Sequence, residues 1–521
     1  MPVEHDSGGA AEAAPGSREG RPAARPLWGK LLDQTRCIGC HACTTACKSE
    51  NEVPVGVTRT YVKSVDIGTF PTARRAFQVT RCNQCQDAPC VTACPTGAMY
   101  QRPDGIVDFN KSICIGCKAC IAACPYDAIF INPDDHSAEK CNFCAHRLDI
   151  GLEPACVVVC PTEAIIVGDL RDPSSRIAQL VNRAPVSVRR PEKETRPKVF
   201  YRGADQATLD PLAARRPSGG IFAWSQQTGP VVSGHPHAPA SSAEALLSYD
   251  IGHSRPWGWR VSLYTWTKGL AAGAYLVPLL LVTVGRLDAA GALWRWCAPL
   301  LAIAFLGVTG ALLISDLKHP WRFPLIFLRP QLRSWLVRGA AVITAYGGLL
   351  AVHLLMSLVV GGGASRWLGI AGGPLAAMTA IYTAFLFAQA KARDLWQSPL
   401  LPAHLFVQAL LAGAAVTLLV AELVSSGAVA PTEWVLGGAA LAHLLLMLSE
   451  VTLTHGTTHA HLAVREMTRG IYAAPFWAGM ALAAVAVAAP LIGPVAVPAA
   501  LLGLLAYEHA YVQAAQSVPL A

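Results

Sequence analysis

The sequence predicts an α+β domain in the first part of the chain and an all-α bundle of eight transmembrane helices in the second. Sixteen of the 17 cysteines lie between Cys37 and Cys160. From about Val261 onward, apolar runs of roughly 20 residues recur, the length at which a helix spans the hydrocarbon core of a bilayer. Hydrophobic residues make up 53% of the chain and charged residues only 15%, an unusual balance for a soluble protein.

The cysteines are grouped in four quartets. Residues 37–47 (CIGCHACTTAC) and 114–124 (CIGCKACIAAC) have the spacing C-x2-C-x2-C-x3-C. The second quartet, within residues 82–94, has one longer gap, and the fourth, within residues 141–160, has an insertion between two pairs. The candidate metal ligands are Cys37, Cys40, Cys43, Cys47, Cys82, Cys85, Cys90, Cys94, Cys114, Cys117, Cys120, Cys124, Cys141, Cys144, Cys156 and Cys160.

This spacing has a physical reason. Three thiolates at every third residue lie on one tight loop and can hold three irons of one [4Fe–4S] cubane, whereas the fourth thiolate faces a different cluster. The prolines that follow three of the quartets, Pro95, Pro125 and Pro161, fix the backbone and end the local helix. Zinc is the alternative, because a single C-x2-C pair, or the fourth quartet alone, also fits a zinc site. Four quartets together favour iron–sulfur clusters, and sixteen cysteines predict four of them.

The segments around the quartets predict an α+β domain over residues 30–197. Short alternating segments such as GIVDF (105–109) and AIFIN (128–132) are typical of small strands. Residues 198–257 are rich in proline, glycine and serine and predict an irregular linker. Residues 1–29 predict a disordered polar tail without an apolar signal core or adjacent arginines, so we expect no export and reduced cysteines.

The four quartets resemble those of the four-cluster electron-transfer subunits of the molybdopterin (dimethyl sulfoxide reductase-like) oxidoreductases, over roughly residues 30–200. The resemblance implies a double ferredoxin-like iron–sulfur domain with four [4Fe–4S] clusters, and a separate molybdopterin-containing catalytic subunit. It also implies that each cluster takes three ligands from one quartet and the fourth from another. The implied sets are Cys37, Cys40 and Cys43 with Cys160; Cys141, Cys144 and Cys156 with Cys47; Cys82, Cys85 and Cys90 with Cys124; and Cys114, Cys117 and Cys120 with Cys94.

Residues 258–521 are predicted to form the membrane domain. A buried helical core of a soluble protein would show polar stripes at helical spacing, and the apolar runs mostly lack them. Six or seven spans are the main alternative to eight. The eight runs lie near residues 261–285, 293–315, 336–360, 370–390, 402–425, 433–454, 472–491 and 494–514.

Basic residues near the ends of the runs predict the orientation. Eleven lie on the side of the amino-terminal domain and three on the opposite side, which by the positive-inside rule puts the cysteine-rich domain in the cytoplasm. We therefore expect a multi-pass protein of the bacterial inner membrane. The two groups are Arg255, Arg260, Lys318, Arg322, Arg329, Arg333, Arg338, Lys391, Arg393, Arg465 and Arg469, and Arg286, Arg295 and Arg366.

Three segments of this half resemble the polysulfide reductase-type membrane anchor family. They read WGWRVSLYTWTKGLAAGAYLV (257–277), DLKHPWRFPLIFLRPQLRSWL (316–336) and IYTAFLFAQAKARDLWQSPLLP (381–402). The resemblance covers most of residues 257–515 and implies an eight-helix anchor without haem that exchanges electrons with a quinone. The chain is then a fusion of a cluster-bearing subunit with its anchor.

Ionisable residues inside membrane spans are costly and indicate function. Lys268 lies two turns into the first run, and three carboxylates lie in or near the cytoplasmic halves of other runs. They predict a quinone pocket in which these groups handle the protons that accompany the electrons. The alternative is structural, with Lys268 paired to Asp316 or Glu450 to tie helices together. The candidate quinone-binding residues are Tyr264, Lys268, Asp316, Tyr382, Glu450 and Glu508.

The favoured interpretation is an electron-transfer and membrane-anchor subunit that relays electrons between a molybdopterin catalytic subunit and menaquinone or ubiquinone. A redox-driven proton or ion translocator is a second hypothesis, with Glu422 and His443 on its path, and a hydrogenase or formate dehydrogenase partner is a third. His353 and His443 are candidates for haem ligation, which is less favoured. No catalytic residue is assigned, and the net charge of +8 lacks the basic, aromatic patch typical of nucleic-acid binding.

Overall fold

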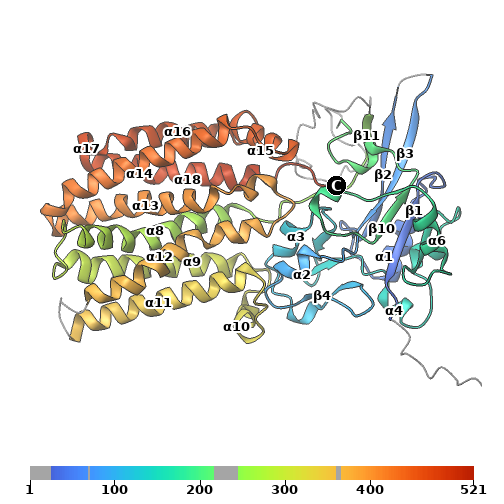
Figure 1. Ribbon diagram of the computed structural model, residues 1–521, viewed down its shortest axis with the longest axis horizontal. Helices are drawn as coiled ribbons and strands as arrows, with labels where there is room; N and C mark the ends of the chain where they lie inside the picture. The colour runs from blue at the N-terminus through green and yellow to red at the C-terminus, as the bar shows by residue number, and fades with distance from the viewer. Residues whose placement is uncertain (1–24, 69–70, 216–244, 360–364) are drawn as a thin grey trace, which may run out of the picture.

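The computed structural model describes residues 25–68, 71–215, 245–359 and 365–521. A mixed α/β part and a long helical bundle lie end to end, and the C-terminus lies at their junction (Figure 1). The α+β domain and the helical region that the sequence predicts are therefore both present. Most of the predicted tail and the centre of the predicted linker lie outside the described residues.

Two sheets form the frame of the α/β part. The four-stranded sheet has the order β8 (Ile165–Asp169), β1 (Trp28–Asp33), β10 (Val199–Arg202), β9 (Val186–Ser187), with β1 and β10 parallel and the outer pairs antiparallel. The antiparallel three-stranded sheet has the order β11 (Ala245–Tyr249), β2 (Thr60–Ile67), β3 (Arg74–Arg81). β3 ends directly before Cys82, so the sheet places the second quartet.

Two small hairpins and several short helices complete this part. The hairpins are β4 (Met99–Gln101) with β5 (Val107–Phe109), and β6 (Ile129–Ile131) with β7 (Ala138–Lys140), which confirms the strands predicted in GIVDF and AIFIN. The helices are α1 (Ala42–Glu50), α2 (Pro89–Ala93), α3 (Ala119–Ala123), α4 (Ala145–Leu148), α5 (Ala155–Val158), α6 (Arg176–Arg183) and α7 (Gln206–Leu209).

The structure differs from the expectation of an irregular linker over residues 198–257. β10 lies beside the central strand β1, in register from Lys30 opposite Val199, and β11 pairs with β2. Both segments are short and apolar, and each satisfies its backbone hydrogen bonds in a sheet formed by much earlier residues. The high proline, glycine and serine content of residues 198–257 as a whole predicted a linker, although two short apolar segments within it form strands.

The helical part consists of long, nearly parallel helices (Figure 1). Seven are long and apolar enough to cross a membrane, or up to eight if the bent pair α15–α16, with an angle of 74°, is counted as one span, within the described residues. The α-helices of this part, long and short, are α8 (Trp259–Thr283), α9 (Ala298–Ser315), α10 (Leu325–Leu328), α11 (Trp335–Val359), α12 (Ser365–Ala388), α13 (Leu401–Val424), α14 (Ser426–Thr452), α15 (Thr458–Thr468), α16 (Ala473–Val487), α17 (Ala489–Ile492) and α18 (Ala496–Ala514).

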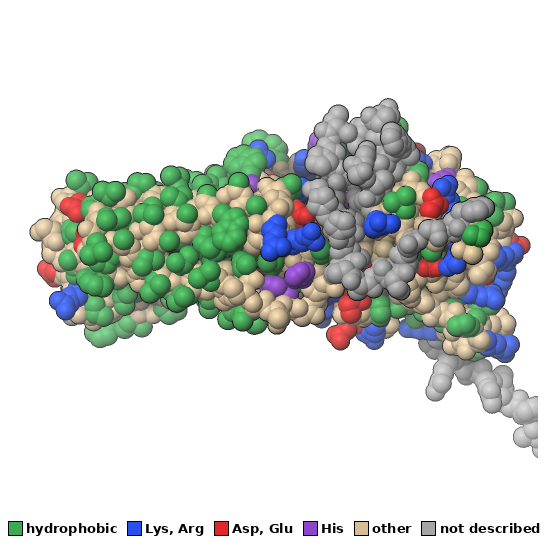
Figure 2. Space-filling model, turned by 90° about the horizontal axis from the view of Figure 1, so that it is seen from above, with side chains coloured by type: hydrophobic (Ala, Val, Ile, Leu, Met, Phe, Trp, Pro, Cys, Tyr) green, Lys and Arg blue, Asp and Glu red, His purple; other side chains and the backbone are tan. Residues whose placement is uncertain are grey.

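The surface of the bundle is suited to lipid. Hydrophobic side chains cover much of the visible face between its two ends, whereas charged side chains gather at the junction and at the far end, and histidines are seen toward the junction (Figure 2). Trp367, Leu423 and Leu445 are among the exposed large apolar residues. Because lipid cannot hydrogen-bond to the backbone, helices with apolar outer faces are the stable way to span it.

Close packing of α8 against α13 organises the bundle. A Cβ atom at Gly273 would overlap the carbonyl oxygen of Ala409 and the backbone of Gly413. Gly269, one turn earlier, has much more room, since the nearest atom to a Cβ there is Cα of Ala409 at 3.9 Å. Small residues of this kind allow helix backbones to approach each other within a membrane.

We expect Gly273→Ala to separate α8 from α13 and to lower the thermal stability of the purified protein, because the added methyl group meets backbone atoms that cannot move aside. Gly269→Ala is the matched control, since it adds the same group to the same helix at an ordinary van der Waals distance of 3.9 Å from the nearest atom. The measurement is the melting temperature in detergent. Equal melting temperatures for the two variants would contradict the predicted role of Gly273.

Candidate electron-transfer site

Three of the four expected cysteine sets each line a separate cavity. One is lined by Cys37, Cys40, Cys43 and Cys160, a second by Cys82, Cys85, Cys90 and Cys124, and a third by Cys94, Cys114, Cys117 and Cys120. In each, three cysteines come from one quartet and the fourth from another quartet. The structure thus brings together the residues that the resemblance to four-cluster subunits implies.

The remaining cysteines also converge. The amide nitrogen of Asn51 lies 3.8 Å from Sγ of Cys47 and 3.7 Å from Sγ of Cys144. Cys47 is in electrostatic contact with Cys141 and Cys156 as well. The fourth set, Cys47 with Cys141, Cys144 and Cys156, is therefore assembled from helix α1 and the segment that contains α4 and α5.

Local backbone geometry explains how a quartet folds. In the two quartets with the shortest spacing, Gly39 and Gly116 have φ of 70° and 68°, and the residues before the helices, His41 and Lys118, have φ of 60° and 62°. These left-handed residues bend the loop so that three thiols face inward. Helices α1 and α3 follow at once, and their length carries the last cysteine toward the neighbouring cavity.

The chemistry of the four sets fits iron–sulfur clusters. In the three sets that line cavities, three cysteines come from one short segment and the fourth from another, which is the ligand pattern of [4Fe–4S] clusters in two-cluster ferredoxins. Burial raises the pKa of Cys43 to about 11 and that of Cys124 to about 12. Such thiols become thiolates at neutral pH only when they bind a metal.

Cys156 has a different environment. Burial raises the pKa of its thiol, but the charges of Lys30 and Arg81 outweigh the burial and lower the pKa to about 7. Nζ of Lys30 lies 3.5 Å from Sγ of Cys156, and Nη1 of Arg81 lies 3.2 Å from the same sulfur. The site thus contains fixed positive charge beside one of its sulfurs.

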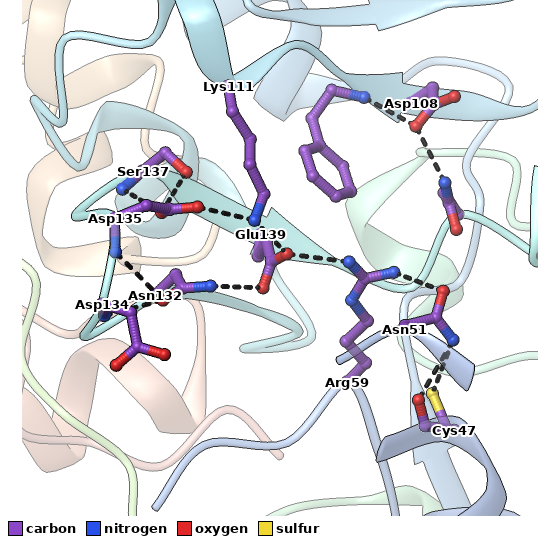
Figure 3. A network of polar contacts seen from close by, with 12 residues as sticks. Cys47, Asn51, Arg59, Asp108, Lys111, Asn132, Asp134, Asp135, Ser137 and Glu139 are labelled. Atoms are coloured by element: carbon purple, nitrogen blue, oxygen red, sulfur yellow. Dashed lines mark hydrogen bonds and ion pairs between the residues drawn. The ribbon is translucent and has the colours of Figure 1, made fainter. Parts of the chain in front are cut away.

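A buried ionic network joins the two halves of the cysteine-rich part (Figure 3). Arg59 donates a hydrogen bond of 2.8 Å to Asn51, the residue that follows helix α1 of the first quartet. Arg59 also forms an ion pair of 2.8 Å with Glu139 on β7. Glu139 also pairs with Lys111, which pairs with Asp135 at 2.6 Å. The network fixes α1 relative to the hairpin β6–β7, and so fixes one cysteine set relative to another.

One cysteine set lies directly against the helical bundle. Nε1 of Trp257 donates to the carbonyl oxygen of Cys117 at 3.2 Å, and Arg322 donates to the carbonyl oxygen of Cys114 at 3.0 Å. Lys118 forms an ion pair of 3.0 Å with Asp316. The set of Cys94, Cys114, Cys117 and Cys120 is consequently the nearest one to the membrane helices.

The structure groups four of the six residues predicted to bind quinone. Nζ of Lys268 lies 5.1 Å from the ring centre of Tyr382 and donates to Oγ1 of Thr383 at 2.9 Å. Tyr264 and Tyr382 both lie beside Thr383, and Lys268 is in electrostatic contact with Glu508. These side chains, from α8, α12 and α18, lie one to three turns from the junction.

Asp316 and Glu450 are placed differently. Asp316 pairs with Lys118 of the cysteine-rich part, and Glu450 lies near Tyr507 and Tyr511. The alternative in which Lys268 pairs with Asp316 or Glu450 is therefore not the arrangement found, because the carboxylate facing Lys268 is Glu508. The positions of the carboxylates in the sequence could not show which of them faces Lys268, since they belong to different helical segments.

Sequence reasoning missed a buried histidine pair. Nε2 of His404 and Nδ1 of His443 lie 2.8 Å apart, and the hydroxyl of Tyr507 lies 3.5 Å from the other nitrogen of His404. His353, the second haem candidate, instead contacts Tyr275, with its Nδ1 3.1 Å from the hydroxyl. His353 and His443 thus have separate partners. His404 follows Pro402 near the start of α13, and nothing in its sequence context distinguished it.

Known protein families match both halves of the sequence. Residues 73–170 match the family described as 4Fe-4S dicluster domain, and residues 249–505 match the family described as Polysulphide reductase, NrfD. The first match covers the second, third and fourth quartets. The second covers most of the helical bundle.

Curated relatives of the first half include subunits of reductases. A tetrathionate reductase subunit of Salmonella typhimurium is 44% identical over 210 residues, 39% of this chain and 82% of that protein. A polysulfide reductase subunit of Wolinella succinogenes is 44% identical over 176 residues, 33% of this chain and 92% of that protein. Protein NrfC of Escherichia coli is 42% identical over 197 residues, 36% of this chain and 88% of that protein. The chain belongs to this family of reductase iron–sulfur subunits.

Membership in the iron–sulfur subunit family agrees with the geometry. The first half is an iron–sulfur domain that transfers electrons, and the second half is an NrfD-type anchor with several membrane helices. The relatives match 33–39% of this chain, and the two family models match separate stretches of it, so the chain joins an iron–sulfur subunit to an NrfD-type anchor. The fusion keeps the cluster domain and the anchor together at the hydrogen-bonded junction.

We expect Glu139→Gln to destabilise the iron–sulfur domain by roughly 3–5 kcal/mol, because it leaves the buried guanidinium of Arg59 without its carboxylate. The control is Asp87→Asn, which breaks the exposed ion pair with Arg196 and should cost about 0–1 kcal/mol. Denaturant unfolding, followed by the loss of cluster absorbance, measures both. A smaller effect for Glu139→Gln than for Asp87→Asn would contradict the role of the network.

Proposed function

We propose that the chain relays electrons between a separate molybdopterin-containing catalytic subunit and a quinone in the membrane, through four [4Fe–4S] clusters. The observation that carries the proposal is the placement of the cysteine sets at two ends. Cys40 of the first set is exposed to solvent, whereas Cys117 of the last set is hydrogen-bonded through its backbone to the anchor. Two electron ports at opposite ends are what a relay requires.

The exposed end supports docking of the catalytic subunit. Apolar side chains next to the first cysteine set are exposed, including Ile38 at 58% and Val158 at 60%. Ile150 and Leu152 lie exposed in the turn between α4 and α5. Exposed apolar patches of this kind mark protein–protein contacts. Subunits of tetrathionate, arsenate and polysulfide reductases among the relatives favour a reductase partner over a hydrogenase or formate dehydrogenase.

The quinone site lies beside the last cysteine set. Trp257, which contacts Cys117, lies two residues before α8, the helix that carries Tyr264 and Lys268. Tyrosine hydroxyls can donate hydrogen bonds to quinone carbonyls, and Lys268 with Glu508 can exchange the accompanying protons. The ion pair of Asp316 with Lys118 links the end of α9 to the loop of the last cysteine set. Menaquinone and ubiquinone share the carbonyl chemistry that this site would recognise.

The orientation follows from charge. The basic side chains of the junction, including Arg322 and Arg338, lie at the end of the bundle that bears the iron–sulfur domain. By the positive-inside rule this end faces the cytoplasm of a bacterium, at its inner membrane. The proposed domains are an N-terminal tail, an iron–sulfur domain that starts with β1 and includes β10 and β11, and the anchor (258–521).

We expect serine substitution at one cysteine of a set, such as Cys120→Ser, to remove one cluster signal and to lower the iron content of the purified protein by about a quarter. Cys297→Ser is the control, because Cys297 lies in the membrane bundle outside all four sets. Iron analysis and electron paramagnetic resonance (EPR) spectra measure the outcome. An unaltered iron content in Cys120→Ser would contradict the ligand assignment.

We expect Tyr264→Phe and Tyr382→Phe each to slow quinol-linked turnover about tenfold or more, because each removes a hydroxyl that lies beside Thr383 in the proposed pocket. Tyr346→Phe is the matched control, since its hydroxyl is equally buried but donates to the carbonyl oxygen of Ala271. Reduction of the clusters by a water-soluble dye should stay normal in all three. Turnover in both site variants equal to that of Tyr346→Phe would refute the proposed pocket.

Proton translocation is a second candidate function, favoured by the His404–His443 pair. Among the described residues, Nε2 of His443 and Oε1 of Gln408 are buried without a hydrogen-bond partner. Gln408 also lines an internal cavity with Thr265 and Glu508. Glu422, the other residue proposed for such a path, is exposed near the far end of α13. Uncoupler-sensitive acidification or alkalinisation of sealed vesicles during turnover would support translocation, and its absence would leave the relay alone.

A further inference from the structure

Two fully buried cations, Lys30 and Arg81, converge on one cysteine sulfur. Lys30 lies in the middle of β1, and Arg81 is the last residue of β3, so the two come from different sheets. Their side-chain nitrogens lie 3.5 Å and 3.2 Å from Sγ of Cys156. Their exposed fractions are 0% and 1%. Removing two charges from water in this way costs several kcal/mol per ion unless negative charge is close by.

Within the described parts of the chain, neither cation forms an ion pair with a carboxylate. Nζ of Lys30 has as its other neighbour the ring of Phe143, 4.5 Å from the centroid, and Nε and Nη2 of Arg81 have no hydrogen-bond partner. Arg59, a third buried cation nearby, differs, because Glu139 neutralises it (Figure 3). The negative charge that Lys30 and Arg81 face is therefore that of the cysteine sulfurs.

Arg81 lies between two cysteine sets. It is in electrostatic contact with Cys156 and Cys141 of one set and with Cys43 of the set that opens to solvent. Lys30, like Arg81, is in electrostatic contact with Cys156, and Lys30 is also in electrostatic contact with Cys144. The positive charge is thus concentrated on the set of Cys47, Cys141, Cys144 and Cys156.

We propose that Lys30 and Arg81 raise the reduction potential of the cluster held by Cys47, Cys141, Cys144 and Cys156, so that it retains an electron passing along the relay. The inference rests on the ligand assignment under the proposed function. One-electron reduction adds one negative charge to a cluster and moves no proton, so nearby fixed positive charge stabilises the reduced form. Lys30 and Arg81 are positioning residues, because they contact a ligand sulfur and no substrate.

The test is an EPR-monitored redox titration of the complete chain with its catalytic partner. The variant Cys144→Ser identifies the signal of this cluster by altering it. In Lys30→Met and in Arg81→Gln, we expect the equilibrium constant for reduction of this cluster to fall at least tenfold. A tenfold fall lowers the reduction potential by about 59 mV for one electron. In Arg81→Gln the signal of the set that contains Cys43, which Arg81 also faces, should shift less, and the two remaining signals should keep their potentials in both variants. Arg81→Lys keeps the positive charge, so the potential of this cluster should be closer to that of the parent protein in Arg81→Lys than in Arg81→Gln.

Arg202→Met provides the matched control. It removes a positive charge from the neighbouring strand β10, but Arg202 is partly exposed and pairs with Asp33. Full iron content with an unchanged potential in both Lys30→Met and Arg81→Gln would overturn the inference and leave the relay intact. Equal shifts of all signals would overturn it as well. Loss of the signal in both variants, with retention in Lys30→Arg and Arg81→Lys, would show that the cations hold the cluster instead of setting its potential, which also refutes the inference.

Discussion

Negative charge on buried sulfur is the constraint on which the rest of the structure depends. Most of the cysteines are buried, and burial disfavours the thiolate form that a cluster needs. Tight loops hold three sulfurs together so that a cluster can bind them as thiolates. At Cys156 the cations of Lys30 and Arg81 stabilise the negative charge as well. Because the cations come from the two sheets, the sheets do more than frame the domain: they set the charge around one cysteine set.

The same constraint explains how the two halves meet. The anchor contacts the last cysteine set mainly through backbone carbonyl oxygens, those of Cys114 and Cys117, and it also accepts Lys118 as an ion-pair partner. The carbonyl oxygens of Ile115 and Gly116 in the same loop accept hydrogen bonds from backbone N–H groups of the anchor as well. The polar ligand loop is therefore held against the anchor by hydrogen bonds, and its cysteine set lies close to the bundle.

Local patterns predicted much of the fold, and long-range pairings were harder to predict. The strands in GIVDF and AIFIN and the long apolar helices follow from patterns within single segments. β10 and β11 were missed because their partners, β1 and β2, lie more than 150 residues away. The partner of Lys268 was misjudged for a related reason: Glu508 lies 240 residues away in the sequence, and helix rotation alone brings it to face Lys268.

The sequence by itself determined which residues carry the chemistry. Quartet spacing reflects how many residues a cluster-binding loop needs, and a run of about 20 apolar residues reflects the thickness of a bilayer, so both can be read from a linear chain. Only the tertiary structure decided which charges lie where. It placed Lys30 and Arg81 beside Cys156 and His404 against His443, because contacts between distant segments depend on sheet register and helix rotation, which no local spacing records.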